Sequence, residues 1–138
     1  MLEGWVPTLK IERLLVADDE AASNPLMRAA MAMAVPPQIR VVMTAVDVTD
    51  FTAAARDPVR TLVLLRDVGA AVFAHAHGLP KGPLNVGNLH AGAGRTQVTR
   101  SVFLSPQERT WLRQLEVAGM QVSLQALPGD PSLPLPPL

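Results

Sequence analysis

Short apolar runs alternate with segments of helical spacing along this chain, and the alternation limits its fold more than any single motif does. The runs that we predict to be strands are Arg13–Ala17, Ile39–Thr44, Thr61–Leu65, Leu84–Val86 and Val122–Leu127. Strands separated by helices are usually joined by right-handed crossovers, which make them parallel. We therefore predict an α/β fold of three layers, in which a mostly parallel open sheet has helices on both faces and an antiparallel edge strand.

Two of these runs carry patterns that predict their place in the sheet. Thr61–Leu65 is nearly continuous in apolar residues, as parallel strands buried on both faces are. Val122–Leu127 alternates apolar with other residues, a pattern typical of a half-exposed strand, so we expect it at the edge.

Helix boundaries are marked by capping side chains and prolines. Ser23–Pro25 and Ser105–Glu108 each place a capping side chain before a proline of the first turn, and the second segment has the residues of a capping box. Asp47 is predicted to begin another helix. The segment Leu2–Leu9 has helical spacing, although it contains a proline.

The length and composition suit one domain with one hydrophobic core. The chain has 138 residues, of which 49% are hydrophobic. We assign residues 1–127 to this domain. The remaining residues, 128–138, are rich in proline and leucine and are expected to form an extended or disordered tail.

Charge and residue usage exclude several classes of function. The formal net charge is zero and no run of like charges occurs, so neither nucleic acid nor a membrane surface is an expected partner. The chain has no cysteine, which excludes disulfides and thiolate metal sites. We expect no metal and no cofactor. Without a secretory signal pattern or an apolar segment long enough to span a bilayer, a cytoplasmic protein is the expectation.

The segment Leu84–Gln97 is the strongest candidate for a binding loop. It begins as an apolar strand and continues into a loop with three glycines. In open α/β sheets, ligands bind where such strands run into loops, and glycine lets backbone N–H groups face an anion. The alternative is a solvated loop held in shape by its glycine and asparagine turns.

Polar residues follow the ends of three predicted strands. Asp18–Glu20, Arg66 and Asn85–Gly87 come directly at or after these ends. Because parallel strands share their carboxyl edge, we expect Asp18–Asp19, Arg66 and Asn85–Gly87 to lie together at one edge of the sheet. The three acids have two interpretations, a cation site or helix capping, and capping is favoured because no fourth ligand group is apparent nearby.

Several segments, in order, resemble one protein family. Leu14–Ala22 is similar to the family pattern "VVVNDEVA", Leu84–His90 to "INVGGMH" or "INVGNIH", and Glu108–Leu127 to "DIEALKELEEAGVEVEVQMVP". These are patterns of the IIB components of the mannose/fructose/sorbose type of the bacterial phosphotransferase system. The order and spacing of the matches extend over most of the chain, which makes them more specific than one short motif.

The resemblance implies a phosphocarrier in sugar uptake. Family members carry a phosphoryl group on a histidine, receive it from a IIA protein and pass it to a sugar moving through membrane IIC/IID partners. Backbone N–H groups of the glycine loop would stabilise the phosphate, and an arginine would neutralise its charge. The candidates for this pocket are Asp19, Arg66, Asn85, Gly87, Asn88, His90 and Arg95. Family members are commonly dimeric, so a homodimer is a further expectation, on which composition is silent.

One departure from the family pattern concerns the phosphohistidine. In the family it lies in a loop of the type "DDRLIHGQV", and Met1–Trp5 resembles the segment that follows this loop. We therefore expect residues 1–138 to be inactive in phosphoryl transfer. The explanations considered are a start assigned too late or a shortened chain, a truncated relative with a regulatory role, and a strand supplied by another chain.

His90 is the remaining candidate acceptor in the loop, although a pocket-lining role fits the family pattern better. His75 and His77 are weaker candidates, because they lie at the end of a predicted helix. Two alternatives to a phosphocarrier stay open. One is a non-catalytic regulatory or binding module of the same fold. The other is an unrelated small-molecule enzyme, which would need an acid–base pair drawn from Asp18, Asp19 and His90.

Overall fold

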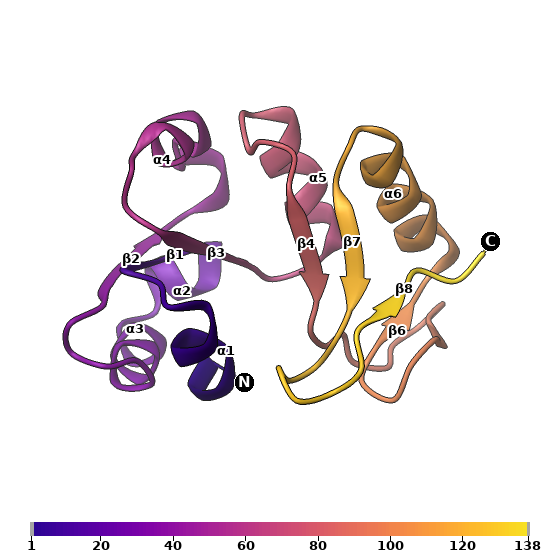
Figure 1. The fold of residues 1–138 in the computed structure, drawn as a ribbon, viewed down its shortest axis with the longest axis horizontal. Helices are drawn as coiled ribbons and strands as arrows, with labels where there is room; N and C mark the ends of the chain where they lie inside the picture. The colour runs from indigo at the N-terminus through magenta and orange to yellow at the C-terminus, as the bar shows by residue number, and fades with distance from the viewer. Residues whose placement is uncertain (1, 138) are drawn as a thin grey trace. The chain divides into compact units, whose positions relative to one another are not determined.

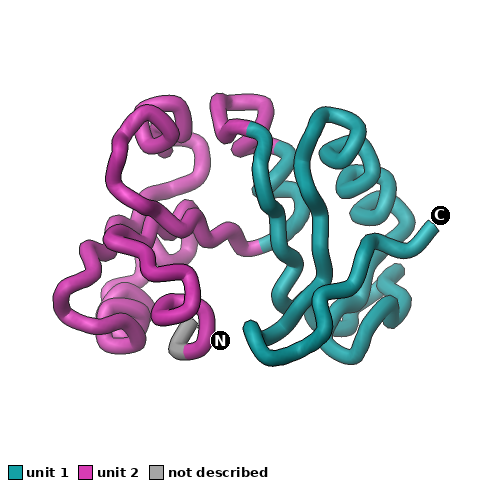
Figure 2. Tube along the Cα trace, viewed as in Figure 1, with its two compact units in different colours: residues 1, 67–72, 81–138 teal, residues 2–66, 73–80 magenta. Residues whose placement is uncertain are grey.

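The computed structural model describes residues 2–137, and Met1 and Leu138, which bound the predicted domain and tail, lie outside the described residues. The chain divides into two compact units (Figure 2). Unit 2 contains residues 2–66 and 73–80, and unit 1 contains residues 67–72 and those from 81 onward. Helix α5 (Val68–Ala76) contributes residues to both. Unit 2 has one sheet, and unit 1 has a three-stranded sheet and an antiparallel pair of short strands, β5 (Thr96–Gln97) and β6 (Phe103–Leu104).

The sheet of unit 2 consists of three parallel strands in the order β2-β1-β3 (Figure 1). Their bounds are β1 (Arg13–Ala17), β2 (Arg40–Thr44) and β3 (Thr61–Leu65). In register, Leu14 lies beside Val41 of β2 and Leu62 of β3. The central strand β1 is the most buried of the three, because it has neighbours on both sides.

Helices cover both faces of this sheet, as predicted. On one face, Leu14 and Val16 pack with Val6 of α1 (Leu2–Leu9) and Ala21 of α2 (Asp19–Ser23), and α3 (Pro25–Met33) adds methionines. On the other face, Ala17 packs with Phe51 of α4 (Phe51–Arg56) and with Ala74 of α5. Side chains of a strand alternate between faces, so β1 supplies both layers of the core.

The strand predicted at Thr61–Leu65 is β3, and it is less buried than its continuous apolar pattern suggests. β3 lies at an edge of its sheet, and all five of its residues are half-buried. Continuous apolar residues show that both faces of a strand are covered by side chains, and helices cover both faces here. The pattern does not report whether a strand has one neighbour or two.

The sheet of unit 1 has the order β4-β7-β8, and the single sheet that the sequence predicts is not formed. β4 (Pro83–Val86) and β7 (Gln121–Leu124) are parallel, whereas β8 (Leu133–Pro134) is antiparallel to β7. The predicted antiparallel edge strand is therefore β8, from the tail. The expectation of an edge position for residues 122–127 is wrong, because β7 pairs on both sides.

Capping determines the helix starts, with one correction. Asn24 caps α3 before Pro25, and Ser105 caps α6 (Pro106–Val117) with the full capping box, as predicted. Asp47 begins no α-helix, since Val46–Val48 is a 3₁₀ turn. Helix α4 begins instead after Asp50, whose carboxylate accepts a hydrogen bond from the Ala53 N–H.

The Pro/Leu tail is extended and packs on unit 1. Leu135 is buried, and β8 pairs with β7. From α6, Arg109 Nη2 donates to the Pro137 carbonyl at 2.5 Å, and Arg113 Nη2 donates to the Pro136 carbonyl at 2.6 Å. The tail's backbone carbonyls are therefore held by arginines of the neighbouring helix.

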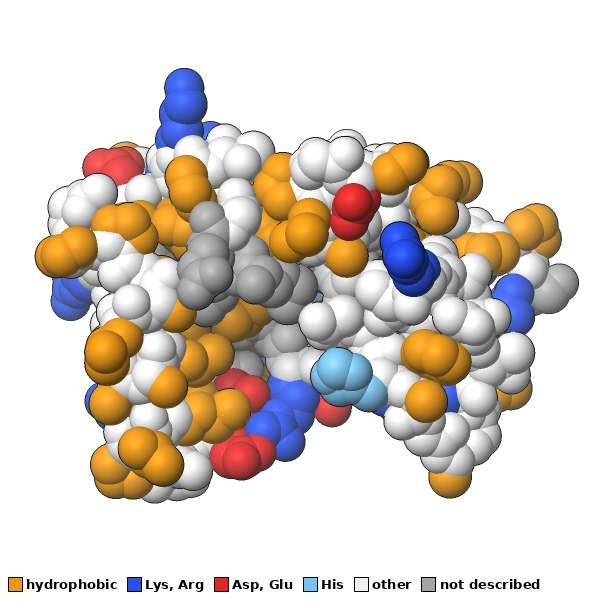
Figure 3. All heavy atoms as spheres, turned by 90° about the horizontal axis from the view of Figure 1, so that it is seen from below, with side chains coloured by type: hydrophobic (Ala, Val, Ile, Leu, Met, Phe, Trp, Pro, Cys, Tyr) orange, Lys and Arg blue, Asp and Glu red, His pale blue; other side chains and the backbone are white. Residues whose placement is uncertain are grey.

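The surface carries charges of both signs. Figure 3 shows one face, where basic and acidic side chains are scattered among apolar and uncharged ones. Some apolar side chains are strongly exposed, among them Leu26 and Met33 of α3. Within residues 2–137, no helix has the length and apolar character needed to cross a bilayer.

Candidate functional site

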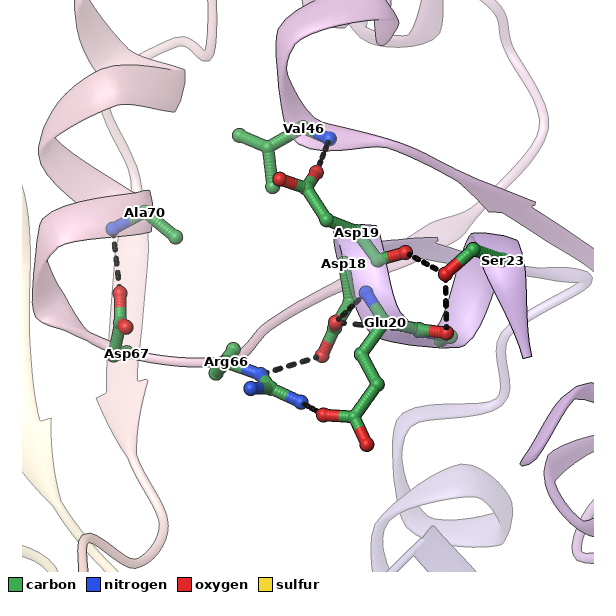
Figure 4. A network of polar contacts seen from close by, with 9 residues as sticks. Asp18, Asp19, Glu20, Ser23, Val46, Arg66, Asp67 and Ala70 are labelled. Carbon is green, nitrogen blue, oxygen red and sulfur yellow. Dashed lines mark hydrogen bonds and ion pairs between the residues drawn. The ribbon is translucent and has the colours of Figure 1, made fainter.

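The acidic loop at the end of β1 serves first as a helix cap. Asp18 is buried, and its Oδ1 accepts hydrogen bonds from the N–H groups of Glu20 at 2.9 Å and Ala21 at 3.3 Å. Asp19 is exposed, and its carboxylate accepts the Val46 N–H at 2.8 Å (Figure 4). The capping interpretation is therefore confirmed for Asp18, while Asp19 connects the loop to the turn after β2.

Arg66 lies beside this loop, as the shared carboxyl edge of β1 and β3 predicts. Its Nε donates to Asp18 Oδ2 at 3.2 Å, and its Nη2 donates to Glu20 Oε2 (Figure 4). These hydrogen bonds, the one to Glu20 first, raise the pKa of the Arg66 guanidinium above its ordinary value. The side chain is still 49% exposed, so a ligand in solution can reach it.

Glu20 is a member of this group that is not among the pocket candidates expected from the sequence. It binds Arg66, so an anion approaching the guanidinium would meet a competing carboxylate. The signal was present, because Glu20 is the third acid after β1 and Arg66 directly follows the neighbouring strand. What the sequence leaves open is which of the three acids faces the arginine.

In unit 1, Asn85 belongs to the strand rather than to the loop. It lies in β4, and its Nδ2 donates to the Gln125 carbonyl at 2.9 Å. The Gln125 N–H in turn donates to the Val86 carbonyl at 3.2 Å. Asn85 therefore holds together the carboxyl ends of β4 and β7, from which the glycine loop departs.

The first half of the loop is fixed around Leu89. This residue is buried, its N–H donates to the Ser101 carbonyl at 3.0 Å, and its carbonyl accepts the Phe103 N–H at 2.9 Å. Ser101 Oγ also donates to the Gly87 carbonyl at 3.1 Å. The neighbours of Leu89, Asn88 and His90, are exposed, so their side chains are accessible beside a fixed backbone.

The second half of the loop is a glycine turn. The Arg95 N–H donates to the Gly92 carbonyl at 3.1 Å, and Gly94 has φ +77°. Of the loop's three glycines, Gly94 alone has a positive φ. We expect all three glycines to allow a positive φ, and only Gly94 uses it.

Arg95 joins this loop to helix α6. Its Nε and Nη2 donate to the two carboxylate oxygens of Glu108 at 3.0 and 2.8 Å, and its Nη1 donates to the His90 carbonyl at 2.9 Å. Glu108 is buried, 8% exposed. Burial alone would raise the pKa of its carboxyl, but hydrogen bonds from Arg95 and Ser105 outweigh burial and lower that pKa.

The structure places the predicted residues in two groups, one in each unit. Asp19 and Arg66 belong to unit 2. Asn85, Gly87, Asn88, His90 and Arg95 belong to unit 1. Within residues 2–137, no three Asp, Glu or His side chains come together as a metal site would require.

The other two histidines are occupied at the end of α5. His75 Nδ1 lies 3.0 Å from the Leu79 carbonyl, and His77 Nδ1 lies 2.8 Å from the Phe73 carbonyl. The His77 ring also stacks on Phe73, with ring centroids 4.0 Å apart. His77 therefore contacts a carbonyl in the last turns of the helix, and His90 is the histidine that lies in the candidate loop.

Comparison with known families and proteins adds a consistent match. The family model described as "PTS system sorbose subfamily IIB component" matches residues 2–138. The N-acetylgalactosamine-specific phosphotransferase enzyme IIB component 2 of Escherichia coli K12 is 27% identical over 132 residues, which are 95% of this chain and 84% of that protein. The fructose-specific EIIB component of Bacillus subtilis is 27% identical over 136 residues, 96% and 82% of the two chains.

Solved structures of similar proteins share the fold. The N-acetylgalactosamine-specific IIB component 1 of Escherichia coli superposes with a TM-score of 0.88 at 23% identity, covering 96% of this chain and 88% of that one. The IIBSor domain of the Klebsiella pneumoniae sorbose permease superposes with a TM-score of 0.82 at 22% identity, covering 94% and 81%. The α/β fold predicted from the sequence is thereby confirmed.

Proposed function

Because this chain belongs to the family of sorbose-subfamily IIB components of the phosphotransferase system, we propose that it serves the phosphoryl transfer that accompanies sugar uptake. The observation that carries this proposal is the family match over residues 2–138. The partners are then a IIA protein as phosphoryl donor and a membrane IIC/IID permease as the route to the sugar, with this chain acting from the cytoplasm. Self-association into a homodimer is part of the same proposal.

For unit 1, we assign the phosphate-facing role to the loop that begins at Gly87. Asn88 and His90 are exposed on either side of the anchored Leu89, so an amide and an imidazole are available to hydrogen-bond an anion. Asn85 supports the loop through its bond to the β7 end. Arg95 belongs to the same group, although its guanidinium is already paired with Glu108.

For unit 2, we assign the accessible cation to Arg66. Its guanidinium is half-exposed and lies at the carboxyl end of β3. Asp18 and Glu20 hold it in place, and Asp19 fixes the loop from which they come. An arginine held by carboxylates is pre-oriented, so it loses less side-chain entropy when it binds an anion.

We propose that residues 1–138 do not accept a phosphoryl group by themselves. The acceptor loop of the family pattern has no counterpart among them. His75 and His77 are engaged with backbone carbonyls, and His90 is assigned to the lining of the pocket.

Phosphoryl transfer from labelled phosphoenolpyruvate, through the upstream phosphocarriers and a IIA protein, tests these assignments. The expected result is no label on residues 1–138, and label on a version extended at its N-terminus by a "DDRLIHGQV"-type strand and loop. Label on residues 1–138 that disappears in His90→Gln would make His90 the acceptor and overturn the pocket-lining role. Failure of both versions to bind phosphorylated IIA or accept label would contradict the proposed function.

A further inference from the structure

We propose that Arg95 and Glu108 form a positioning pair, which fixes the main chain at His90 and thereby sets the shape of the loop from Gly87 to Arg95. In this role Arg95 acts on a bound phosphoryl group through the loop and not as its direct ligand. The contacts of unit 1 support the role of the pair in shaping the loop. Its effect on phosphate rests on the proposed function.

The geometry of Arg95 leaves little of it free for a ligand. A guanidinium has five N–H donors on three nitrogens, and each of the three nitrogens donates one hydrogen bond here. Two of these bonds form a bidentate pair with Glu108, and the third goes to the His90 carbonyl. Bidentate pairing fixes the plane of the guanidinium. The pairing with Glu108 neutralises the charge of Arg95 and also orients its Nη1 toward the His90 carbonyl.

Glu108 is itself fixed to the start of α6. One of its carboxylate oxygens accepts the Ser105 N–H at 2.9 Å, while the Glu108 N–H donates to Ser105 Oγ at 3.1 Å. The helix is anchored in the core by Leu112 and Leu115, which are buried. A continuous path of hydrogen bonds thus leads from a packed helix to the exposed loop.

The loop beyond Leu89 depends on this path. Residues 90–94 are exposed. In the part of the chain that the structure describes, the backbone hydrogen bonds shown for these residues are the Gly92–Arg95 turn and the contact between Arg95 and the His90 carbonyl. Only the second connects the segment to the rest of unit 1, so its loss should free the loop locally.

A direct contact of Arg95 with phosphate would have a clear cost. The guanidinium would have to leave Glu108, and a buried carboxylate would lose its partner, which is strongly unfavourable. The pKa of Glu108 is already below its ordinary value because of these partners, so the carboxylate stays charged. The pair is therefore better suited to hold the loop than to exchange ligands.

Backbone ¹⁵N order parameters of residues 90–94 in the free chain test the positioning role. Arg95→Lys retains the charge but cannot make the bidentate pair and the third bond together. We expect it to lower these order parameters from about 0.85, the value of a rigid backbone, toward about 0.6, as Arg95→Gln does. If the order parameters of Arg95→Lys equal those of the unaltered chain, the proposal is overturned.

Two further variants keep this test sharp. Glu108→Gln retains an acceptor for the Ser105 N–H but loses the charge that holds Arg95, so the order parameters of residues 90–94 should also fall. Arg113→Lys is the matched control, because Arg113 on the same helix pairs with Glu116 and holds the tail at Pro136. It should leave residues 90–94 unchanged, and an equal effect there would show general loosening and overturn the proposal.

Titration with inorganic phosphate, followed by the amide and imidazole signals of Asn88 and His90, separates the two proposals. If Arg95 acts through the loop, Arg95→Lys weakens phosphate binding as much as Arg95→Gln does. If Arg95 is a direct ligand, Arg95→Lys keeps most of the affinity, and the positioning role is overturned. No phosphate response in the unaltered chain would contradict the pocket of the proposed function, whereas the order parameters of residues 90–94 still decide the positioning role.

Discussion

At the scale of single residues, Asp18 combines two tasks that different substitutions can separate. One carboxylate oxygen caps α2 and the other receives Arg66. Asp18→Asn keeps a capping oxygen but loses the ion pair, whereas Asp18→Ala loses both. We expect Asp18→Ala to lower the free energy of unfolding by about 1–2 kcal/mol and Asp18→Asn by less than half of that, since the pair with the half-exposed Arg66 adds less than the cap. Urea unfolding of both variants measures the difference, and equal losses would contradict the dominance of the cap.

The contribution of Glu108 to stability should depend on pH. Its folded pKa is lowered, so its stabilising effect is complete above the ordinary carboxyl range and is lost as the pH falls through that lowered pKa. Glu108→Gln should lower the free energy of unfolding by about 2 kcal/mol at neutral pH, and the gap to the unaltered chain should shrink as the pH falls below the ordinary carboxyl range. Asp57, whose pKa is also lowered, first by its hydrogen bond from Val59, contributes equally in both chains. A gap that stays constant with pH would contradict the charged pairing.

At the scale of elements, the sequence predicts where helices and strands begin better than it predicts which strands pair. The caps at Asn24 and Ser105 are predictable because the capping side chain and its N–H partners are close in sequence. β1 is predictable for a similar reason, as a compact apolar run. The edge position of β3 and the pairing of the tail as β8 are not predictable, because strand neighbours are determined by long-range packing that no local pattern records.

The contacts of the candidate site likewise differ in how far the sequence predicts them. Arg66 beside Asp18 follows from parallel strands, whereas the contact of Arg95 with Glu108 joins a loop to a helix.

The turn after α5 offers a test of how an element ends. Gly78 has φ +113°, and a Cβ built on it would lie 2.0 Å from Thr52 Oγ1. Gly94 also has a positive φ, +77°, but has open space around it. Gly78→Ala should therefore lower the free energy of unfolding by more than about 2 kcal/mol, and Gly94→Ala by about 1 kcal/mol, the cost of the backbone conformation alone. Thermal unfolding of the two variants compares them directly, and equal shifts would exclude a steric contribution at Gly78.

At the scale of the whole molecule, the chain has no net charge and an exposed apolar helix, α3. The formal net charge is zero at pH 7, so little electrostatic repulsion keeps copies apart there. Helix α3 has no buried residue, and Leu26 and Met33 are 80% and 86% exposed. We expect solubility to pass through a minimum near neutral pH, with α3 as the main site of association between copies.

Paired substitutions distinguish the helix from charge alone. Leu26→Lys with Met33→Lys adds two positive charges on α3, and Val48→Lys with Val117→Lys adds the same charge at two other strongly exposed apolar positions. If α3 drives association, the first pair should raise the solubility at pH 7 several-fold more than the second, because it also removes the apolar contact. Precipitation by polyethylene glycol, measured across the pH range, gives both values. Equal gains would assign the effect to net charge and leave α3 without a special role.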